Sequence, residues 1–159
     1  MTGKTIVGCD PGLSGAVCVL DDNELMAFRM PIFTYEGAQG KSKRKIDTIA
    51  LKNILQDEKK NNPHVYIERV HAMPGQGVSS MFSMGFGCGI IEAAVMCCGL
   101  PLTYVTPQKW KKDLQVPADK DGARLRASQL MPQYAHNWSL KKDHGIAEAA
   151  LIALWGMRQ

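Results

Sequence analysis

The order of apolar runs in the first thirty residues constrains the fold of this chain more than any other feature. Short apolar runs at residues 5–9, 15–20 and 25–30, of which the second is rich in β-branched residues, are separated by polar turn segments at 10–14 and 21–23. Runs of this length between turn residues are typical of β-strands, and such short connections join antiparallel neighbours. The sequence therefore predicts an N-terminal antiparallel meander of three strands.

After residue 33 the pattern changes, and helices and strands are expected to alternate. Residues 34–45 are rich in Gly and Lys, and we expect a loop there. The expected elements that follow are a helix from 46 to about 60, a strand at 64–68, a long, small and apolar helix at 78–98, a strand at 102–106, and helices at 107–112, 121–131 and 144–157. This order predicts an α/β fold in which helices flank a mixed five-stranded sheet. The helix at 78–98 is expected to be buried.

Size and composition favour one soluble domain over residues 1–159. Hydrophobic residues make up 45% of the chain and charged residues 21%, as in ordinary globular proteins. We expect no apolar stretch of the roughly 18 to 20 residues that spans a bilayer, and so no membrane role. We also expect no signal segment, hence a cytoplasmic protein of a bacterial or phage-infected cell, or an organellar one if the chain is processed.

The five cysteines are interpreted as reduced thiols in the core rather than as metal ligands. Their positions do not give the paired spacing of zinc ligands; they are Cys9, Cys18, Cys88, Cys97 and Cys98.

The net charge of +4 is modest, but the basic residues are clustered. One cluster contains Lys41, Lys43, Arg44 and Lys45, and the other contains Lys109, Lys111 and Lys112. Such clusters suit a phosphate backbone, although short lysine runs are also common in solvated loops. Charge alone leaves both readings open.

Two acidic residues stand directly after apolar strands. Asp10 follows the first strand, beside glycines that allow a tight turn, and Glu68 ends the strand at 64–68. A carboxylate in such a place is costly to bury unless it is paired, hydrogen-bonded or bound to a cation. Each could simply cap a turn, but two such strand ends together with a third acidic element favour a metal site.

The third element is the beginning of the last helix. His144 and Glu148 are one turn apart on the same face, whereas Asp143 and Glu148 diverge by about 140°. His144 is therefore the better partner of Glu148, and Asp143 suits the N-cap of the helix. The alternative for His144 is an ordinary solvent-facing residue of the first turn.

Three carboxylates and a histidine would suit two Mg²⁺ ions about 4 Å apart, which clamp the attacking water and the leaving oxygen of a phosphodiester. Mn²⁺ can substitute because one ligand is an imidazole, and zinc is not indicated. No nucleotide cofactor is expected.

Three motifs together resemble the RuvC family of Holliday junction resolvases in the ribonuclease H-like superfamily. They are Gly-Cys-Asp-Pro-Gly-Leu-Ser-Gly-Ala at 8–16, Tyr-Ile-Glu at 66–68 followed by a Gly-Gln-Gly loop, and His-Gly-x-Ala-Glu-Ala-x-Leu-Ile-Ala at 144–153. The match covers most of the chain, as a single RuvC-like nuclease domain. It is closest to the plant plastid resolvase and its phage relatives, in which the last helix carries a histidine and a glutamate four residues apart.

The resemblance implies a set of site residues. Asp10, Glu68, His144 and Glu148 would bind metal, and Lys120 would neutralise charge on the scissile phosphate. Phe82 and Phe86 would meet unstacked bases or a second subunit, or would be core residues. The expected DNA-binding residues are Lys43, Arg44, Gly75, Gln76, Phe82, Phe86, Lys111, Lys112 and Arg124.

The implied function is a magnesium-dependent endonuclease that resolves four-way DNA junctions with paired symmetric nicks, as a homodimer with two active sites. Alternatives are another ribonuclease H-like nuclease acting on different branched DNA or on an RNA–DNA hybrid, and a non-catalytic junction-binding protein. The Asp-Pro-Gly-x-Ser-Gly-Ala turn also resembles the phosphate-binding turn of actin-like ATPases, but those proteins need two such domains.

Overall fold

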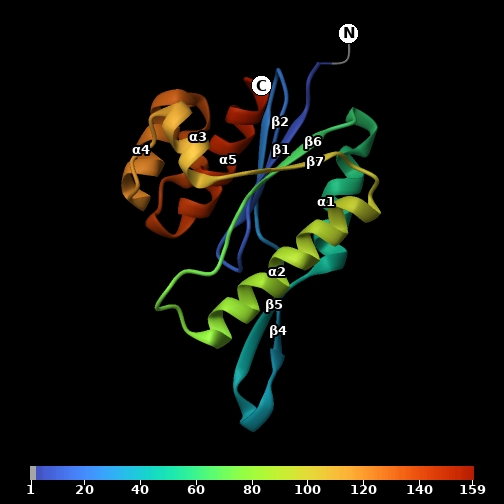
Figure 1. Ribbon diagram of the computed structural model, residues 1–159. Helices are drawn as coiled ribbons and strands as arrows, with labels where there is room; N and C mark the ends of the chain where they lie inside the picture. The colour runs from blue at the N-terminus through green and yellow to red at the C-terminus, as the bar shows by residue number, and fades with distance from the viewer. Residues whose placement is uncertain (1–2) are drawn as a thin grey trace.

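The computed structural model describes residues 3–159 and contains a mixed five-stranded sheet in the order β3-β2-β1-β6-β7 (Figure 1). The first three strands, β1 (Ile6–Asp10), β2 (Ala16–Leu20) and β3 (Leu25–Arg29), form an antiparallel meander. Strands β6 (His64–Glu68) and β7 (Leu102–Val105) extend the sheet in parallel with β1. The predicted five-stranded α/β sheet with its antiparallel start is confirmed.

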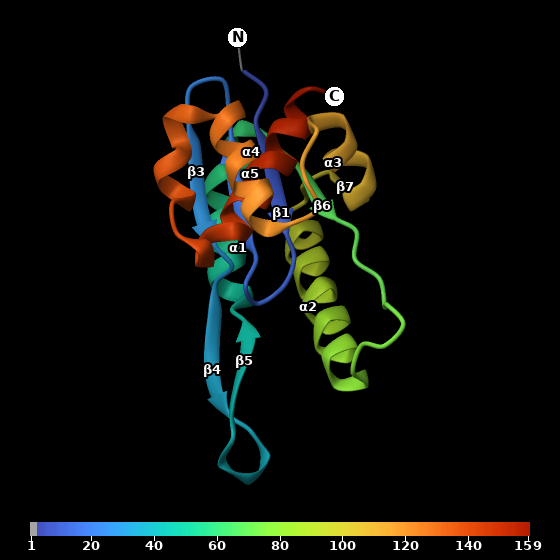
Figure 2. The same ribbon diagram turned by 90° about the vertical axis from the view of Figure 1, so that its left-hand side faces the viewer.

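Helices cover both faces of the sheet, which makes three layers (Figures 1 and 2). One face carries α3 (Pro107–Leu114), α4 (Lys120–Leu130) and α5 (His144–Met157), and the other carries α1 (Thr48–Glu58) and α2 (Val78–Cys97). Short 3-10 helices complete the chain: η1 (Ala38–Gly40), η2 (Lys59–Asn61), η3 (Pro132–Trp138) and η4 (Lys141–Asp143).

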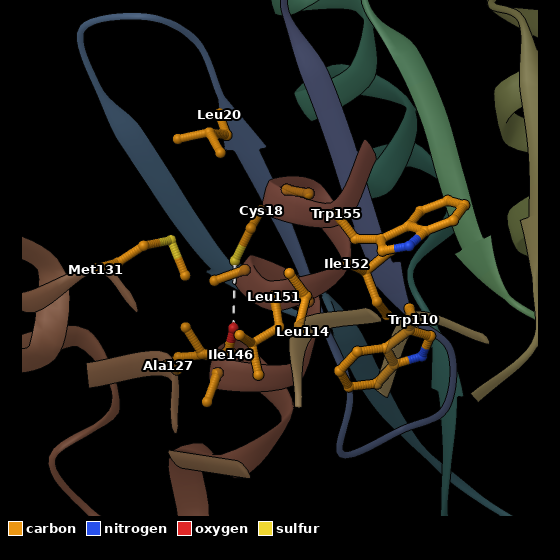
Figure 3. Close-up of a cluster of buried hydrophobic side chains, with 14 of the residues drawn as sticks. Cys18, Leu20, Trp110, Leu114, Ala127, Met131, Ile146, Leu151, Ile152 and Trp155 are labelled. Atoms are coloured by element: carbon orange, nitrogen blue, oxygen red, sulfur yellow. Dashed lines mark hydrogen bonds between the residues drawn. The ribbon is translucent and has the colours of Figure 1, made fainter. Parts of the chain in front are cut away.

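Strand alternation divides the core into two halves. Ile6 on β1 faces the α5 side, where it packs with Leu151 and Ile152, whereas its neighbour Val7 faces α1 and packs with Leu55. Successive strand residues point to opposite faces, so a sheet covered on both sides needs apolar residues at nearly every position. Figure 3 shows the half of the core around α5, including Trp110 and Trp155.

Two glycines let α5 lie directly on β1 and on the turn that follows it. A Cβ atom on Gly8 would lie 2.2 Å from the Ala149 carbonyl oxygen, and one on Gly145 would lie 2.5 Å from the Ser14 carbonyl oxygen. Both distances are far below van der Waals contact, so only glycine allows this approach. The beginning of α5 is therefore fixed beside the β1–β2 turn.

The expectation of a loop at residues 34–45 was wrong. The chain forms a hairpin there, from β4 (Ile32–Glu36) and β5 (Ser42–Ile46), which projects beyond the main sheet (Figures 1 and 2). Three consecutive basic residues hide the strand character of β5, because strand propensity expresses packing against neighbours more than an intrinsic preference.

The expectation that α2 would be buried was also wrong. Only Ile91, Ala94 and Val95 of this helix are buried, and its N-terminal half extends past the sheet, leaving Phe82 76% exposed. The helix has 20 residues and a mean hydropathy of 1.5, so one helix in the described part of the chain is long and apolar enough to cross a membrane, contrary to our expectation. Its C-terminal half packs against α1 and β7, as in a core helix of a globular domain.

The cysteines agree with the core interpretation only in part. Cys9, Cys18 and Cys98 are buried and Cys88 is half-buried, but Cys97 is exposed near the end of α2. All five thiols are free.

Candidate active site

The first two carboxylates meet because their strands are parallel neighbours. In the β1–β6 ladder Cys9 is paired with Ile67, so the residues that follow, Asp10 and Glu68, end adjacent strands at the same edge of the sheet. Carboxyl ends of parallel strands are a common place for functional groups in α/β proteins. The edge of the sheet thus supplies two acidic side chains at one point.

The third carboxylate comes from α5, above β1. Burial raises the pKa of Asp10 well above its ordinary value, and the carboxylates of Glu148 and Glu68 raise it further, in that order. Ten of the 14 residues of α5 are buried, and Glu148 is a partly exposed acidic residue among them. Three mutually repelling acidic groups in a poorly hydrated place cost stability unless a cation joins them.

Trp110 holds Glu68 in a defined orientation. The indole Nε1 donates a hydrogen bond of 2.8 Å to Glu68 Oε2, and the Trp110 side chain is completely buried. Burial raises the pKa of Glu68, the Trp110 hydrogen bond lowers it, and Glu148 raises it. Sequence reasoning missed Trp110, and the only signal for it is its place between Lys109 and Lys111, where a core tryptophan is unusual.

The next residue, Lys111, forms an ion pair with Glu148. Its Nζ lies 3.0 Å from Glu148 Oε1, and both side chains are largely buried. The positive charges of Lys111 and Lys120 lower the pKa of Asp10. The sequence suggested only DNA binding for Lys111, whereas the structure places it among the carboxylates.

Helix α3 is held in the position that presents Trp110 and Lys111 together. Thr106 caps its start by accepting a hydrogen bond from the Lys109 amide, and Asp113 near its end accepts one of 2.7 Å from Trp155 of α5. The cap fixes where α3 begins and the Trp155 hydrogen bond fixes α3 against α5, so two adjacent side chains reach Glu68 and Glu148.

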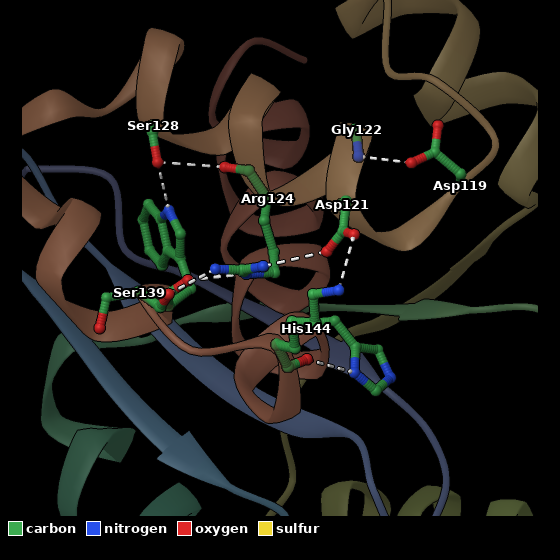
Figure 4. A network of polar contacts seen from close by, with 9 residues as sticks. Asp119, Asp121, Gly122, Arg124, Ser128, Ser139 and His144 are labelled. Atoms are coloured by element: carbon green, nitrogen blue, oxygen red, sulfur yellow. Dashed lines mark hydrogen bonds and ion pairs between the residues drawn. The ribbon is translucent and has the colours of Figure 1, made fainter.

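His144, at the start of α5, lines the same cleft as Asp10 and Glu148. Its Nδ1 lies 3.3 Å from the Lys141 carbonyl oxygen (Figure 4). A carbonyl oxygen can only accept a hydrogen bond, so this contact requires the proton on Nδ1 and leaves the Nε2 lone pair free. That is the arrangement usual for a histidine that ligates a metal.

The interpretation of Asp143 as a side-chain cap was wrong. Asp143 occupies the N-cap position of α5, but its carboxylate makes no capping hydrogen bond. Instead it is 6% exposed and forms an ion pair with Arg29 at the end of β3. A buried carboxylate is stabilised more by a guanidinium than by a single amide, which explains the preference.

Comparison with solved structures shows the fold. RuvC of Thermus thermophilus in complex with a Holliday junction substrate superposes with a TM-score of 0.61 and 15% identity, covering 96% of this chain and 91% of RuvC. Another structure of Thermus thermophilus RuvC superposes with a TM-score of 0.57 and 16% identity, covering 95% of this chain and 92% of RuvC. This chain has the RuvC fold.

The yeast mitochondrial Holliday junction resolvase Ydc2 is similar as well, with a TM-score of 0.53 and 14% identity over 98% of this chain and 78% of that one. No protein-family model matches the chain, and no curated protein matches it. The predicted ribonuclease H-like architecture is confirmed, and the closer resemblance to the plant plastid resolvase stays a prediction.

Around this RuvC-type sheet edge, one cleft of about 1120 Å³ brings together many of the predicted site residues. Its lining includes Asp10, Lys43, Arg44, Phe82, Phe86, His144 and Glu148. Phe82 and Phe86 stack with ring centroids 6.4 Å apart, and both are exposed, so they are not core residues.

The other predicted residues, Glu68 and Lys111 among them, lie outside the lining of the cleft. Gly75 and Gln76 are exposed on the loop before α2, and Lys112 is exposed on α3. Lys120 is exposed at the first position of α4. The Arg124 guanidinium is engaged in contacts within the protein: it donates hydrogen bonds to the Trp138 and Ser139 carbonyl oxygens and forms an ion pair with Asp121 (Figure 4).

The donor set of this site fits divalent metal, although the side chains are not yet arranged around one. Within residues 3–159, no three Asp, Glu, His or Cys side chains stand ready to hold a single ion. Glu68 and Glu148 point instead to Trp110 and Lys111. Carboxylate oxygens are the ligands that Mg²⁺ prefers. Burial and then the neighbouring carboxylates raise the pKa of Asp10, and a bound cation would offset this penalty on its charged form.

Proposed function

We propose that this protein is an endonuclease that uses divalent metal to cut four-way DNA junctions. The observation that carries the proposal is the meeting of Asp10, Glu68 and Glu148 at one edge of a RuvC-type sheet, beside a cleft lined by Asp10, Glu148 and His144. The similarity to RuvC solved with a Holliday junction substrate, and to a mitochondrial resolvase, supports the choice of substrate.

In this proposal Asp10, Glu68, His144 and Glu148 hold two Mg²⁺ ions. When bound, such ions activate a water as nucleophile and stabilise the charge that develops on the phosphate. The chain's own residues prepare the site: Trp110 donates a hydrogen bond to one oxygen of Glu68, and the other oxygen is the one that would bind metal. The Lys141 carbonyl fixes the tautomer of His144.

Lys111 has a further role in this proposal. Its ammonium group neutralises Glu148 at 3.0 Å. With Glu148 among the residues that would hold the metal, the Lys111 ammonium would be available to the phosphate, where a fixed positive charge stabilises the transition state. Lys120, which also lowers the pKa of Asp10, is the second candidate for this task.

We further propose that the protein acts as a homodimer and makes paired nicks. A four-way junction presents two equivalent strands, so symmetric cutting needs two active sites related by a two-fold axis. Helix α2 offers an exposed face for this contact, with the small residues Gly85, Gly89 and Ala93 and the 63% exposed Met96 at helical spacing. Small residues allow two helices to approach closely, and exposed apolar patches mark interfaces.

Other ribonuclease H-like nucleases use similar metal sites on different substrates. The deciding experiment compares a four-way junction, a flap, a linear duplex and an RNA–DNA hybrid, each with Mg²⁺, with Mn²⁺ and with chelator. The proposal predicts metal-dependent cleavage with the highest rate on the junction. Preference for the RNA–DNA hybrid would assign another activity to the same site, and binding without cleavage of any substrate would refute the enzymatic role.

A further inference from the structure

The β4–β5 hairpin projects away from the sheet on its own and needs an explanation. Its root is anchored by Ile46, which is buried, but Phe33, only one residue pair further out, is already 45% exposed. Two-stranded hairpins are only marginally stable in water without a surface to pack on. A hairpin of this kind is therefore expected to be held by a neighbour or covered by a partner.

Part of the support comes from α2, through a shared lysine. Lys45 Nζ lies 5.2 Å from the ring centroid of Tyr35 on the opposite strand and 5.3 Å from that of Phe86 on α2. A cation between two aromatic faces is attracted to both. Lys45 thus links the hairpin to α2 and sets the separation between them.

The hairpin is also strongly basic. Lys41, Lys43, Arg44 and Lys45 are all exposed, and within residues 3–159 none of them forms an ion pair with a carboxylate. Glu36 is the acidic residue of the two strands. Unneutralised positive charge on a projecting element suits a polyanion as the covering partner, not a second copy of the same basic hairpin.

The hairpin and the first half of α2 form the two walls of the cleft, and Asp10 lies within its lining. The volume of about 1120 Å³ is close to the upper end, about 1000 Å³, of pockets for small ligands. Its walls carry exposed basic residues, Lys43 and Arg44, and exposed aromatic rings, Phe82 and Phe86. A positively charged groove with exposed aromatic rings is the combination that binds single-stranded nucleic acid, so the cleft suits an unpaired strand that reaches Asp10.

We propose that the hairpin and α2 form a clamp that admits an unpaired DNA strand to the metal site and thereby selects branched DNA over continuous duplex. This inference rests on the proposed nuclease function and adds the element that gives it selectivity. Lys43 and Arg44 bind the phosphates of the strand, and the exposed rings of Phe82 and Phe86 stack with its bases.

The test removes the two phosphate-binding charges with the variant Lys43→Ser/Arg44→Ser. The matched control is Lys59→Ser/Lys60→Ser, which removes two exposed charges from η2, outside the cleft. Affinity is measured against salt for a single-stranded oligonucleotide and a four-way junction, and cleavage rates are measured for the junction and a linear duplex. Circular dichroism and size-exclusion mass are recorded for every variant.

The clamp predicts at least a tenfold loss of single-strand affinity for the hairpin variant. The salt slope should fall by about 1.4, since each phosphate contact on a single strand contributes about 0.7. The ratio of junction to duplex cleavage should fall at least fivefold, and the control should change none of these values more than twofold. Lys45→Gln roughly keeps the size of the side chain but removes the cation that Tyr35 and Phe86 share. It should lower the ratio of junction to duplex cleavage by less than Lys43→Ser/Arg44→Ser does.

Two results would overturn the clamp while leaving the nuclease in place. One is an equal loss of cleavage on junction and duplex. The other is a hairpin variant that becomes monomeric with unchanged DNA affinity, because the hairpin would then be covered by a second copy. Failure of the proposed function is a different outcome: wild-type protein that cleaves no DNA with either metal.

Discussion

The ion pair between Arg29 and Asp143 gives an asymmetric prediction for stability. The Asp143 side chain is 7% exposed and that of Arg29 is 59% exposed. Arg29→Ala leaves a buried carboxylate without a partner, which costs about 3–5 kcal/mol in fully buried pairs. Water reaches this pair through the exposed arginine, so we expect about 2–3 kcal/mol after discounting for solvent screening.

Asp143→Ala removes the buried charge instead and leaves an arginine that turns into solvent. Its expected cost is about 1 kcal/mol, the upper range of an exposed pair. For a domain of this size each kcal/mol shifts the melting temperature by about 2–4 °C. Arg29→Ala should therefore lower it by about 4–12 °C and Asp143→Ala by about 2–4 °C.

Thermal unfolding followed by circular dichroism at pH 7 measures both shifts, and the double variant Arg29→Ala/Asp143→Ala completes the cycle. The double variant should be more stable than Arg29→Ala alone, because no buried charge is left unpaired. A larger loss for Asp143→Ala than for Arg29→Ala would show that the carboxylate stabilises the start of α5 by another contact, and the reasoning would be refuted.

Three further predictions concern the site. Asp10→Asn should abolish cleavage and raise the melting temperature at pH 7. Burial and the neighbouring carboxylates raise the folded-state pKa of Asp10, so the wild type loses stability as pH rises from the ordinary Asp range through that pKa. Thermal melts at pH 4 to 8 without divalent metal test this, and a lower melting temperature for the variant than for the wild type at pH 7 contradicts it. Gly145→Ala should push α5 away from the Ser14 carbonyl, with a cost of about 1–3 kcal/mol and a loss of cleavage in protein that is still folded; unchanged cleavage would mean that this close approach does not position the site. His144→Ala should lose at least a hundredfold in cleavage rate under saturating Mg²⁺ while Asp143→Ala stays within about tenfold, and the reverse order would rule out His144 as a ligand.

The elements that sequence reasoning predicted correctly are those whose signals are local. The meander follows from apolar runs of strand length between turn residues, and Asp10 and Glu68 were found because each ends such a run. Their adjacency then follows from parallel pairing of the two strands.

The parts that were missed depend on packing between distant segments. Strand β5 is basic and owes its structure to pairing with β4 and to the contact of Lys45 with Phe86. The apolar composition of α2 predicts a buried helix, but it does not reveal that the sheet extends along only half of the helix. Trp110 and Lys111 reach the carboxylates only because α3 is fixed against α5, and no sequence pattern gives that contact.

The central claim is that this carboxylate cluster cuts four-way junctions, and mapping the nicks tests it most directly. A synthetic junction with each of its four strands end-labelled in turn is incubated with Mg²⁺, with chelator, and with the folded variant Glu148→Gln. The account predicts paired nicks at symmetric positions on two opposite strands, present only with Mg²⁺ and absent for the variant. Nicks that persist in chelator or with Glu148→Gln, or a junction that stays intact with wild-type protein and Mg²⁺, would contradict it.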